Sequence, residues 1–325
     1  MFYICIGELY INKVMRILIL DCTGNDWTDR NLSKLENVEV EAVYKQMPLF
    51  VRIIRRVHFL INFPMKSFWY GDWKYKILDY DCIIVFSALF GNEIFSWIRK
   101  AGYTGKIILY YRDPQSACYL SKSIKADVMT GDQSAVELWT FDKNDAQNYF
   151  MKYNPQFYFD APETDVSPKY DAVYIGASRG RYESIINCYE GLKRQGLNVR
   201  FYVKTDKPRV KNDEIVYIKD NIEYEEILQL NKYAKAIVEI NQFGQNGLTV
   251  RALEALFMRK KLITNNLNVE NEKFYNPNNI FILGKDNINT IYEWVNTPFR
   301  NVPTDIIEYY KAESWLKRFG GVEKI

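Results

Sequence analysis

One stretch, residues 236–266 (AIVEINQFGQNGLTVRALEALFMRKKLITNN), constrains the fold of this chain more than any other. Residues 236–240 form a short apolar run typical of a buried strand, and residues 241–247 carry the Asn, Gln and Gly that favour a loop. Residues 248–258 have the apolar spacing of a helix with one buried face, and residues 261–265 indicate a second strand. The order strand, loop, helix, strand predicts a parallel α/β unit, and such sheets bind ligands at the carboxyl ends of their strands.

The length and composition predict an ordinary globular protein of roughly two domains at ~150 residues each. The chain has 325 residues, of which 48% are hydrophobic and 26% are charged, and its net charge of +3 points to no particular partner. Its five cysteines form no CxxC pair, which favours buried thiols in a reducing compartment over a disulfide framework or a zinc site. The single histidine, His58, excludes a metal site built from several histidines and any HExxH motif.

The first 14 residues are apolar, but they are too short to span a bilayer and lack the features of a signal peptide. Met15 opens a clean strand pattern (MRILILD), so we expect the native chain to start there. A cytoplasmic protein is the expectation that follows.

The first half of the chain alternates short apolar runs with helical patterns, which predicts a parallel α/β sheet. Asp142 and Asp145 suit the first turn of a helix, so we expect them to cap it. Asp79-Tyr80-Asp81 has the DxD form of some metal-dependent sugar transferases, but it precedes its strand instead of following it, and we interpret it as chance. The expected strands are 16–21, 38–44, 81–87, 106–111, 126–130 and 137–141, with a helix at 92–101.

Residues 160–169 (DAPETDVSPK) carry two prolines, several acids and no apolar run, which indicates a linker. A second α/β pattern follows it and ends before a terminal helix at 303–319. We therefore expect a first domain at 15–160, a second at 169–302 and a C-terminal unit at 303–325. The expected elements of the second domain include strands at 170–175, 199–203 and 279–283 and helices at 182–194, 223–230 and 287–296.

Residues 45–76 depart from this pattern, because they hold seven Lys or Arg and a single acid, Asp72. Between Pro48 and Pro64 the apolar residues share one helical face, while Arg52, Arg55 and Arg56 fall opposite. One interpretation is a helix packed in the core with a solvated basic face. Another is a helix lying in an anionic membrane surface, with aromatic residues at the headgroup level. Binding to nucleic acid is a third, although no motif supports it. The membrane-facing residues would be Arg52, Arg55, Arg56, Trp69 and Trp73.

The turn after the first strand of the second domain, GASRGR, is neither a GxGxxG fingerprint nor a Walker A loop. Its Gly176 allows a tight turn, and its Arg179 and Arg181 follow the strand at the place where a phosphate would sit. Lys204 ends the next strand at the same edge. Arg and Lys side chains fixed at one edge suit a diphosphate.

Two α/β domains, this turn and the 236–266 unit together resemble a GT-B glycosyltransferase. The likeness is to the retaining group with a Glu-x7-Glu pattern and to related bacterial polysaccharide-synthesis transferases. It implies two Rossmann-like domains that face a cleft, with a C-terminal helix that crosses back to the first domain. In that group an Arg and a Lys hold the donor diphosphate, at places similar to Arg181 and Lys204. The second Glu of the pattern, which binds the donor ribose, matches Glu254, whereas the first falls at Asn246.

The resemblance implies an enzyme that moves a sugar from a nucleotide-sugar donor to a saccharide acceptor, lipid-linked in surface polysaccharide synthesis such as that of capsule or lipopolysaccharide. It implies no metal and no cofactor, and association with the inner face of the plasma membrane. A non-catalytic binding protein or a membrane scaffold of the same fold is the alternative. Arg251 and Glu254 share a helix face, and a plain ion pair is their other interpretation. The implied donor-binding residues are Gly176, Arg179, Arg181, Lys204, Asn246, Gly247, Leu248, Thr249, Arg251 and Glu254, and Asp26 or Asp113 would act on the acceptor hydroxyl.

Overall fold

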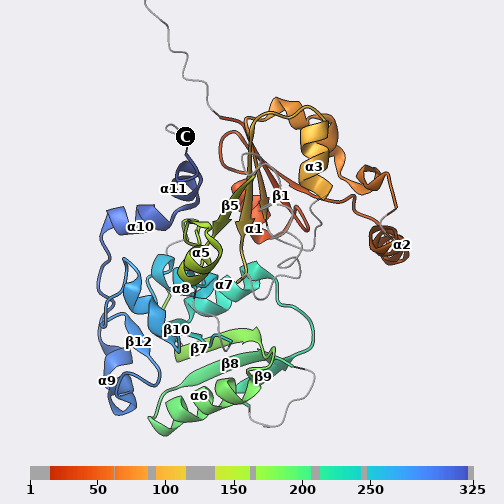
Figure 1. Ribbon diagram of the computed structural model, residues 1–325. Helices are drawn as coiled ribbons and strands as arrows, with labels where there is room; N and C mark the ends of the chain where they lie inside the picture. Colours follow the sequence, from red (N-terminus) through yellow and green to blue (C-terminus); the bar gives the residue numbers. More distant parts are fainter. Residues whose placement is uncertain are drawn as a thin grey trace, which may run out of the picture.

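The computed structural model describes residues 15–61, 63–86, 93–114, 136–161, 166–205, 213–242 and 247–320. Within them the chain forms two six-stranded sheets whose paired strands all run parallel, one in the upper and one in the lower part of Figure 1. The expected α/β class, with two Rossmann-like domains, is confirmed. Residues 1–14 and the expected strand at 126–130 lie outside the described residues, so both of these interpretations stay predictions.

The first sheet has the order β2-β1-β3-β4-β5-β6. Its central strands are buried along their whole length because the sheet is covered on both faces, which explains their continuous runs of Ile, Leu and Val. Its strands are β1 Ile17–Asp21, β2 Val38–Ala42, β3 Cys82–Phe86, β4 Lys106–Tyr111, β5 Glu137–Thr140 and β6 Lys152–Tyr153, and its helices include α1 Trp27–Leu32, α2 Leu49–Leu60, α3 Glu93–Lys100 and α5 Lys143–Tyr149.

The second sheet has the order β12-β11-β10-β7-β8-β9, so the direction of winding reverses between β7 and β10. In open α/β sheets a ligand site forms at such a point. The strand β9 was not expected from the sequence, because it is short and three of its four residues are only half-buried. The elements are β7 Tyr170–Ala177, α6 Tyr182–Arg194, β8 Val199–Lys204, β9 Ile215–Ile218, α7 Tyr224–Lys232, β10 Ala234–Glu239, α8 Val250–Phe257, β11 Lys261–Thr264, η4 Leu267–Asn271, β12 Ile280–Ile282, η5 Ile288–Thr290 and α9 Ile291–Asn296.

The C-terminal segment returns to the first domain, as Figure 1 shows at the left of the molecule. It forms two helices, α10 Thr304–Tyr310 and α11 Ala312–Lys317, where the sequence predicted one. The break occurs because Lys311 is extended and its neighbours bond to Tyr158 in the segment after β6: the Tyr158 N–H donates to Tyr310 O, and the Ala312 N–H donates to Tyr158 O. Trp315 of α11 is then buried among apolar residues of the first sheet.

The basic segment 45–76 forms α2 followed by short turns at η1 Lys66–Trp69 and η2 Asp72–Tyr75; η3 Ile77–Asp79 comes next. The expectation that Trp69 and Trp73 lie at a membrane surface is wrong, because both are buried in the first domain. The Trp73 indole donates to Val43 O at 3.0 Å, and the Trp69 indole donates to His58 Nδ1 at 2.8 Å. No helix in the described ranges is both long and apolar enough to cross a bilayer.

Candidate functional site

A cavity of about 510 Å³ opens at the carboxyl ends of β7 and β10, where the winding of the second sheet reverses. The second domain supplies most of its lining, and the first domain contributes the end of β4. The lining residues are Asp113, Pro114, Tyr174, Ile175, Gly176, Arg179, Arg181, Tyr224, Val238, Glu239, Ile240, Asn241, Gln242, Thr249, Val250, Arg251 and Glu254. The cavity therefore unites the Gly-Arg turn, the start of α8 and Asp113, which the sequence had suggested separately.

Two arginines bring positive charge to this cavity. The turn between β7 and α6 places Arg179 and Gly180 in the left-handed region, at φ values of 37° and 82°. The Arg181 guanidinium donates to Ala177 O at 3.2 Å and to Ile240 O, so it is fixed between the ends of β7 and β10. Neither Arg179 nor Arg181 forms an ion pair with a residue that the structure describes. Both charges are available to an anionic ligand.

Two buried polar groups in the cavity lining lack a hydrogen-bond partner among the described residues: the Tyr174 hydroxyl and the Asn241 Nδ2 amide. Their side chains are 2% and 7% exposed. A buried donor without a partner costs about 1–3 kcal/mol, so a ligand that accepts from these groups would recover that free energy. Gly176 belongs to the same arrangement, because a Cβ there would lie only 2.8 Å from the Tyr174 hydroxyl.

The start of α8 is fixed by a buried carboxylate. Thr249 caps the helix by accepting from the Arg251 N–H at 3.1 Å, and its hydroxyl donates to Glu239. Glu239 also accepts from the Thr264 hydroxyl of β11. Burial raises the pKa of Glu239 above its ordinary value, while the hydrogen bonds from the two hydroxyls oppose that shift. This network holds the first turn of α8 at the edge of the cavity.

Arg251 and Glu254 form an ion pair, and Glu254 is 1% exposed in the interior. The Glu254 carboxylate also accepts from the Tyr224 hydroxyl and, at 3.1 Å, from the Asn231 amide. Burial raises the pKa of Glu254, and the Arg251 charge opposes the shift. The ribose-binding role implied for Glu254 stays a prediction, since three donors from the chain already contact its carboxylate.

The other described residues implied at the donor site do not line the cavity. Lys204 lies beside Ala177 at the same sheet edge, but its ammonium donates to Asn221 Oδ1 at 2.7 Å and does not line the cavity. Gly247 packs against Phe141 of the first domain, where a Cβ would be 2.4 Å away. The Leu248 side chain is buried in the apolar core of the second domain and does not line the cavity, so a contribution to donor binding through the backbone at the start of α8 stays a prediction. Asn246 lies outside the described residues.

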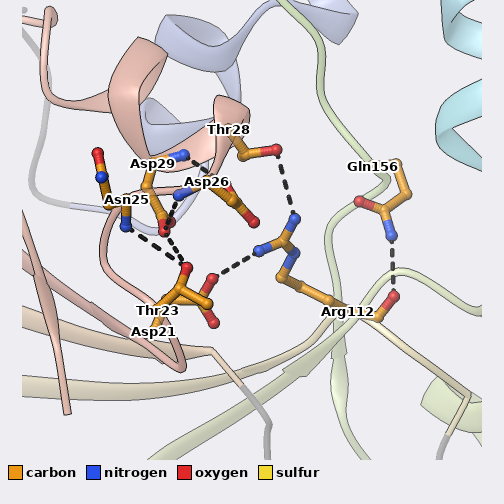
Figure 2. A network of polar contacts seen from close by, with 8 residues as sticks. All are labelled: Asp21, Thr23, Asn25, Asp26, Thr28, Asp29, Arg112 and Gln156. Carbon is orange, nitrogen blue, oxygen red and sulfur yellow. Dashed lines mark hydrogen bonds and ion pairs between the residues drawn. The ribbon is translucent and has the colours of Figure 1, made fainter. Parts of the chain in front are cut away.

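The two carboxylates implied to act on the acceptor, Asp113 and Asp26, lie in different places. Asp113 lines the cavity, whereas Asp26 is the N-cap of α1. Figure 2 shows this capping box, in which Asp26 accepts from the Asp29 N–H at 2.8 Å and Asp29 accepts from the Asp26 N–H at 3.0 Å. Asp142 likewise caps α5, accepting from the Asn144 N–H at 2.8 Å, as the sequence predicted.

Asp21, Asp26 and Asp29 bring carboxylate oxygens within 4.8 Å of one another. Each already has a partner in the chain: Asp21 pairs with Arg112 at 3.0 Å, and the other two form the capping box (Figure 2). Burial, reinforced by the neighbouring Asp21 and Asp26 charges, raises the pKa of Asp29 to about 7. The cluster is accounted for by these contacts, so we assign it no metal.

Several cavity residues were not predicted from the sequence, among them Glu239, Asn241, Tyr174 and Tyr224. Glu239 and Asn241 could have been found, because they are polar residues at the carboxyl end of an apolar strand, where ligands bind. Tyr174 lies inside a strand and Tyr224 starts a helix, and neither position carries a sequence signal that distinguishes it from a core tyrosine.

No family model matches the sequence, and no curated protein matches it. Solved structures do resemble the fold. Anabaena HepE in complex with UDP and glucose superposes with a TM-score of 0.58 at 9% identity, covering 94% of this chain and 98% of that chain. The lipopolysaccharide outer core galactosyltransferase WaaB in its apo form gives 0.51 at 11% identity, with the same coverage. The DNA-modifying enzyme β-glucosyltransferase gives 0.51 at 13% identity, covering 93% of this chain and 98% of that chain.

These likenesses extend over both domains, and the chain has the GT-B fold of these glycosyltransferases. Identities of 9–13% show the fold alone. The narrower likeness to the retaining Glu-x7-Glu group stays a prediction.

Proposed function

We propose that the chain is a glycosyltransferase that moves a sugar from a nucleotide-diphosphate-sugar donor to a saccharide acceptor. One observation carries this: the cavity at the switch point of the second sheet holds two arginines without ion-pair partners beside two buried polar groups without hydrogen-bond partners, counted over the described residues. A diphosphate supplies both the negative charge and the acceptor oxygens that these groups lack. The solved relatives of this fold include a complex with UDP-glucose, which supports the proposal.

In the proposed reaction the bond between the anomeric carbon and the donor phosphate oxygen breaks, and a bond from the acceptor oxygen to that carbon forms. The nucleoside diphosphate leaves with the electron pair, and the charge that grows on it is stabilised by Arg179 and Arg181. The acceptor proton passes to a carboxylate, for which Asp113 is better placed than Asp26, because only Asp113 lines the cavity. The arginines supply the positive charge, so we propose transfer without a metal or cofactor.

We also propose that the acceptor saccharide is carried on a lipid, in the synthesis of a surface polysaccharide. The resemblance to WaaB, a lipopolysaccharide galactosyltransferase, supports this part. On the acceptor side, the described residues Asp113 and Pro114 line the cavity.

The experiment is a thermal-shift and calorimetric screen with UDP-, GDP-, TDP- and CMP-sugars, followed by Arg181→Ala. Losing a charge-assisted hydrogen bond costs about 1.5–3 kcal/mol, so the variant should bind the stabilising nucleotide roughly ten- to a hundredfold more weakly. Arg194→Ala is the matched control, because Arg194 lies exposed at the other end of α6. It should leave the affinity unchanged.

Glu254→Ala is a poor probe of the same site, because it would leave the Tyr224 hydroxyl and the Asn231 amide without their acceptor and Arg251 without its counter-charge, and each unsatisfied buried donor costs about 1–3 kcal/mol of stability. Unchanged nucleotide affinity in Arg181→Ala would remove the donor from this cavity. Nucleotide-sugar binding without release of nucleoside diphosphate, tested over a panel of saccharide acceptors, would favour the non-catalytic alternative.

A further inference from the structure

The helix α2 has no buried residue, and half of its residues are large apolar side chains that are exposed. Between 50% and 77% of each of these side chains is exposed, which is unusual for a contiguous set on a soluble surface. They recur at the spacing of one helical face. These residues are Leu49, Phe50, Ile53, Ile54, Val57 and Leu60. Figure 1 shows α2 at the right edge of the first domain, apart from the sheet.

The opposite face of α2 is the one that contacts the domain. Phe59 packs edge-to-face on Tyr44 with ring centroids 5.6 Å apart, and the Arg55 guanidinium lies 4.1 Å from the same Tyr44 ring. His58 bonds to Trp69. With about 3.6 residues per turn, Arg55 and Phe59 fall opposite Phe50, Ile54 and Val57, and His58 lies at the boundary between the two faces. The apolar face therefore points outward because the other face is the attached one.

The exposed apolar side chains continue past the helix. Ile61, Phe63 and Met65 are 65%, 56% and 76% exposed. Met65 adopts the left-handed conformation at φ 65°, which is uncommon for a non-glycine residue. Together with the apolar face of α2 these three residues form what we call the α2 surface.

Basic residues border the α2 surface. Arg52 and Arg56 are exposed on α2 and form no ion pair with any described residue, and Lys45 and Lys66 lie on either side of the helix in sequence. The only acid in residues 45–76 is Asp72. Lys76 is excluded from this border, because Glu39 and Glu41 neutralise it. The surface is apolar at its centre and positive at its edge.

We propose that the α2 surface docks this protein on a bilayer that contains anionic lipids, with α2 lying in the plane of the interface. Apolar side chains would enter the boundary between headgroups and acyl chains, and Arg52 and Arg56 would remain among the phosphates. A second copy of the chain fits less well, because a symmetric contact through this surface would bring the same basic residues against one another. The inference does not depend on the donor site, and it would place a lipid-borne acceptor beside the first domain.

The test is co-sedimentation of the full chain with vesicles of phosphatidylcholine alone or mixed with an equal part of phosphatidylglycerol. Wild type should pellet with the anionic vesicles, and less in high salt, because salt screens the attraction. Arg52→Ser with Arg56→Ser should weaken binding roughly 30-fold, at about fivefold for each basic residue near an anionic surface. Phe50→Ser with Ile54→Ser should weaken it at least as much. Arg55 is left intact because it packs on Tyr44.

The matched control is Leu267→Ser with Tyr292→Ser, which removes two exposed apolar side chains from the second domain and should leave vesicle binding unchanged. Nucleotide affinity, measured on every variant, shows that the fold and the donor site persist and keeps this test separate from the proposed function. Equal pelleting of wild type and the Phe50/Ile54 variant, or no pelleting of wild type, would overturn the proposal. So would a wild-type dimer in sedimentation velocity that the Phe50/Ile54 variant abolishes, since a second copy would then cover the surface.

Discussion

The buried carboxyl group of Asp29 should make the stability of the first domain depend on pH. Its side chain is fully buried, Oδ2 accepts from the Thr23 hydroxyl and the Asp26 N–H, and Oδ1 has no partner among the described residues. Burial first, and then the charges of Asp21 and Asp26, raise its pKa from 3.8 to about 7. The native state thus holds a proton that the unfolded chain releases at lower pH.

The resulting prediction concerns stability between pH 4 and 7.5. Because the folded pKa is the higher one, the contribution of Asp29 to stability is present below pH 3.8 and is lost as the pH rises through about 7. Asp29→Asn keeps an oxygen that can accept both hydrogen bonds but cannot ionise. Between pH 5 and pH 7.5 its free energy of unfolding should therefore fall less than that of wild type.

Urea denaturation of both proteins at the two pH values measures this difference. Groups elsewhere titrate equally in both proteins and cancel in the comparison. Parallel pH profiles for wild type and variant would show that Asp29 does not take up a proton in this range.

Among the secondary-structure elements, α2 is attached to the first domain through few contacts. His58 contributes hydrogen bonds to this attachment through both of its ring nitrogens. The Trp69 indole N–H donates to His58 Nδ1 at 2.8 Å, so Nε2 carries the ring hydrogen. Nε2 can then donate to the carbonyls of Phe63 and Pro64, at 3.1 and 2.8 Å. His58 thereby ties the C-terminal end of α2 to η1 and to the segment between them.

We predict that His58→Ala loosens α2 without unfolding the domain. Losing about two hydrogen bonds costs roughly 1–3 kcal/mol of local stability, or about 5- to 150-fold in the population of the open helix. Hydrogen exchange should accelerate at the amides of α2 and leave β1 and β3 unchanged. Arg52→Ala, on the exposed side of the same helix, is the control and should alter exchange in α2 far less. Equal protection in His58→Ala and wild type would contradict the role of His58.

At the scale of the whole molecule, α1 joins the two domains beside the candidate site. The Trp27 ring of α1 lies 4.3 Å from the Tyr224 ring of α7 and 5.5 Å from the Tyr158 ring, in the segment after β6. Tyr224 lines the cavity and donates to Glu254. An exposed ion pair, Arg30 with Glu225, links the same two helices. The contact between Trp27 and Tyr224 therefore holds the first domain against a residue that lines the cavity.

Trp27→Ala should therefore open the cleft and disturb nucleotide binding together. We expect a larger radius of gyration in small-angle X-ray scattering and a weaker nucleotide affinity, because Tyr224 loses its packing partner. Arg30→Ala is the comparison, since exposed ion pairs contribute only about 0–1 kcal/mol, and it should change both quantities much less. Equal effects of the two substitutions would show that the aromatic contact does not control the spacing.

The features that depend on the local order of residues could be predicted from the amino-acid sequence. The apolar periods located most strands and helices, including α6 at 182–194, and the carboxyl-edge rule of parallel sheets placed Arg179, Arg181 and Thr249 beside one cavity. The alternation of strands and helices predicted two parallel α/β domains, and the GT-B expectation came from the resemblance that these domains, the Gly-Arg turn and residues 236–266 carry together. These features need only neighbours in the chain, because the period of an element and the direction of its strands are fixed locally.

Whether the apolar face of a helix or strand is covered by another element became clear from the folded chain alone. An amphipathic pattern tells which side chains point the same way, but not whether another element packs on them. The apolar face of α2 is exposed, whereas Trp69 and Trp73, predicted at the surface, are buried. The pairing of Arg251 with the buried Glu254 arises in the same way, and so do the Tyr174 hydroxyl and the Asn241 side-chain amide that have no hydrogen-bond partner among the described residues. Burial and pairing are decided by residues far apart in the chain, and that information is absent from any local pattern.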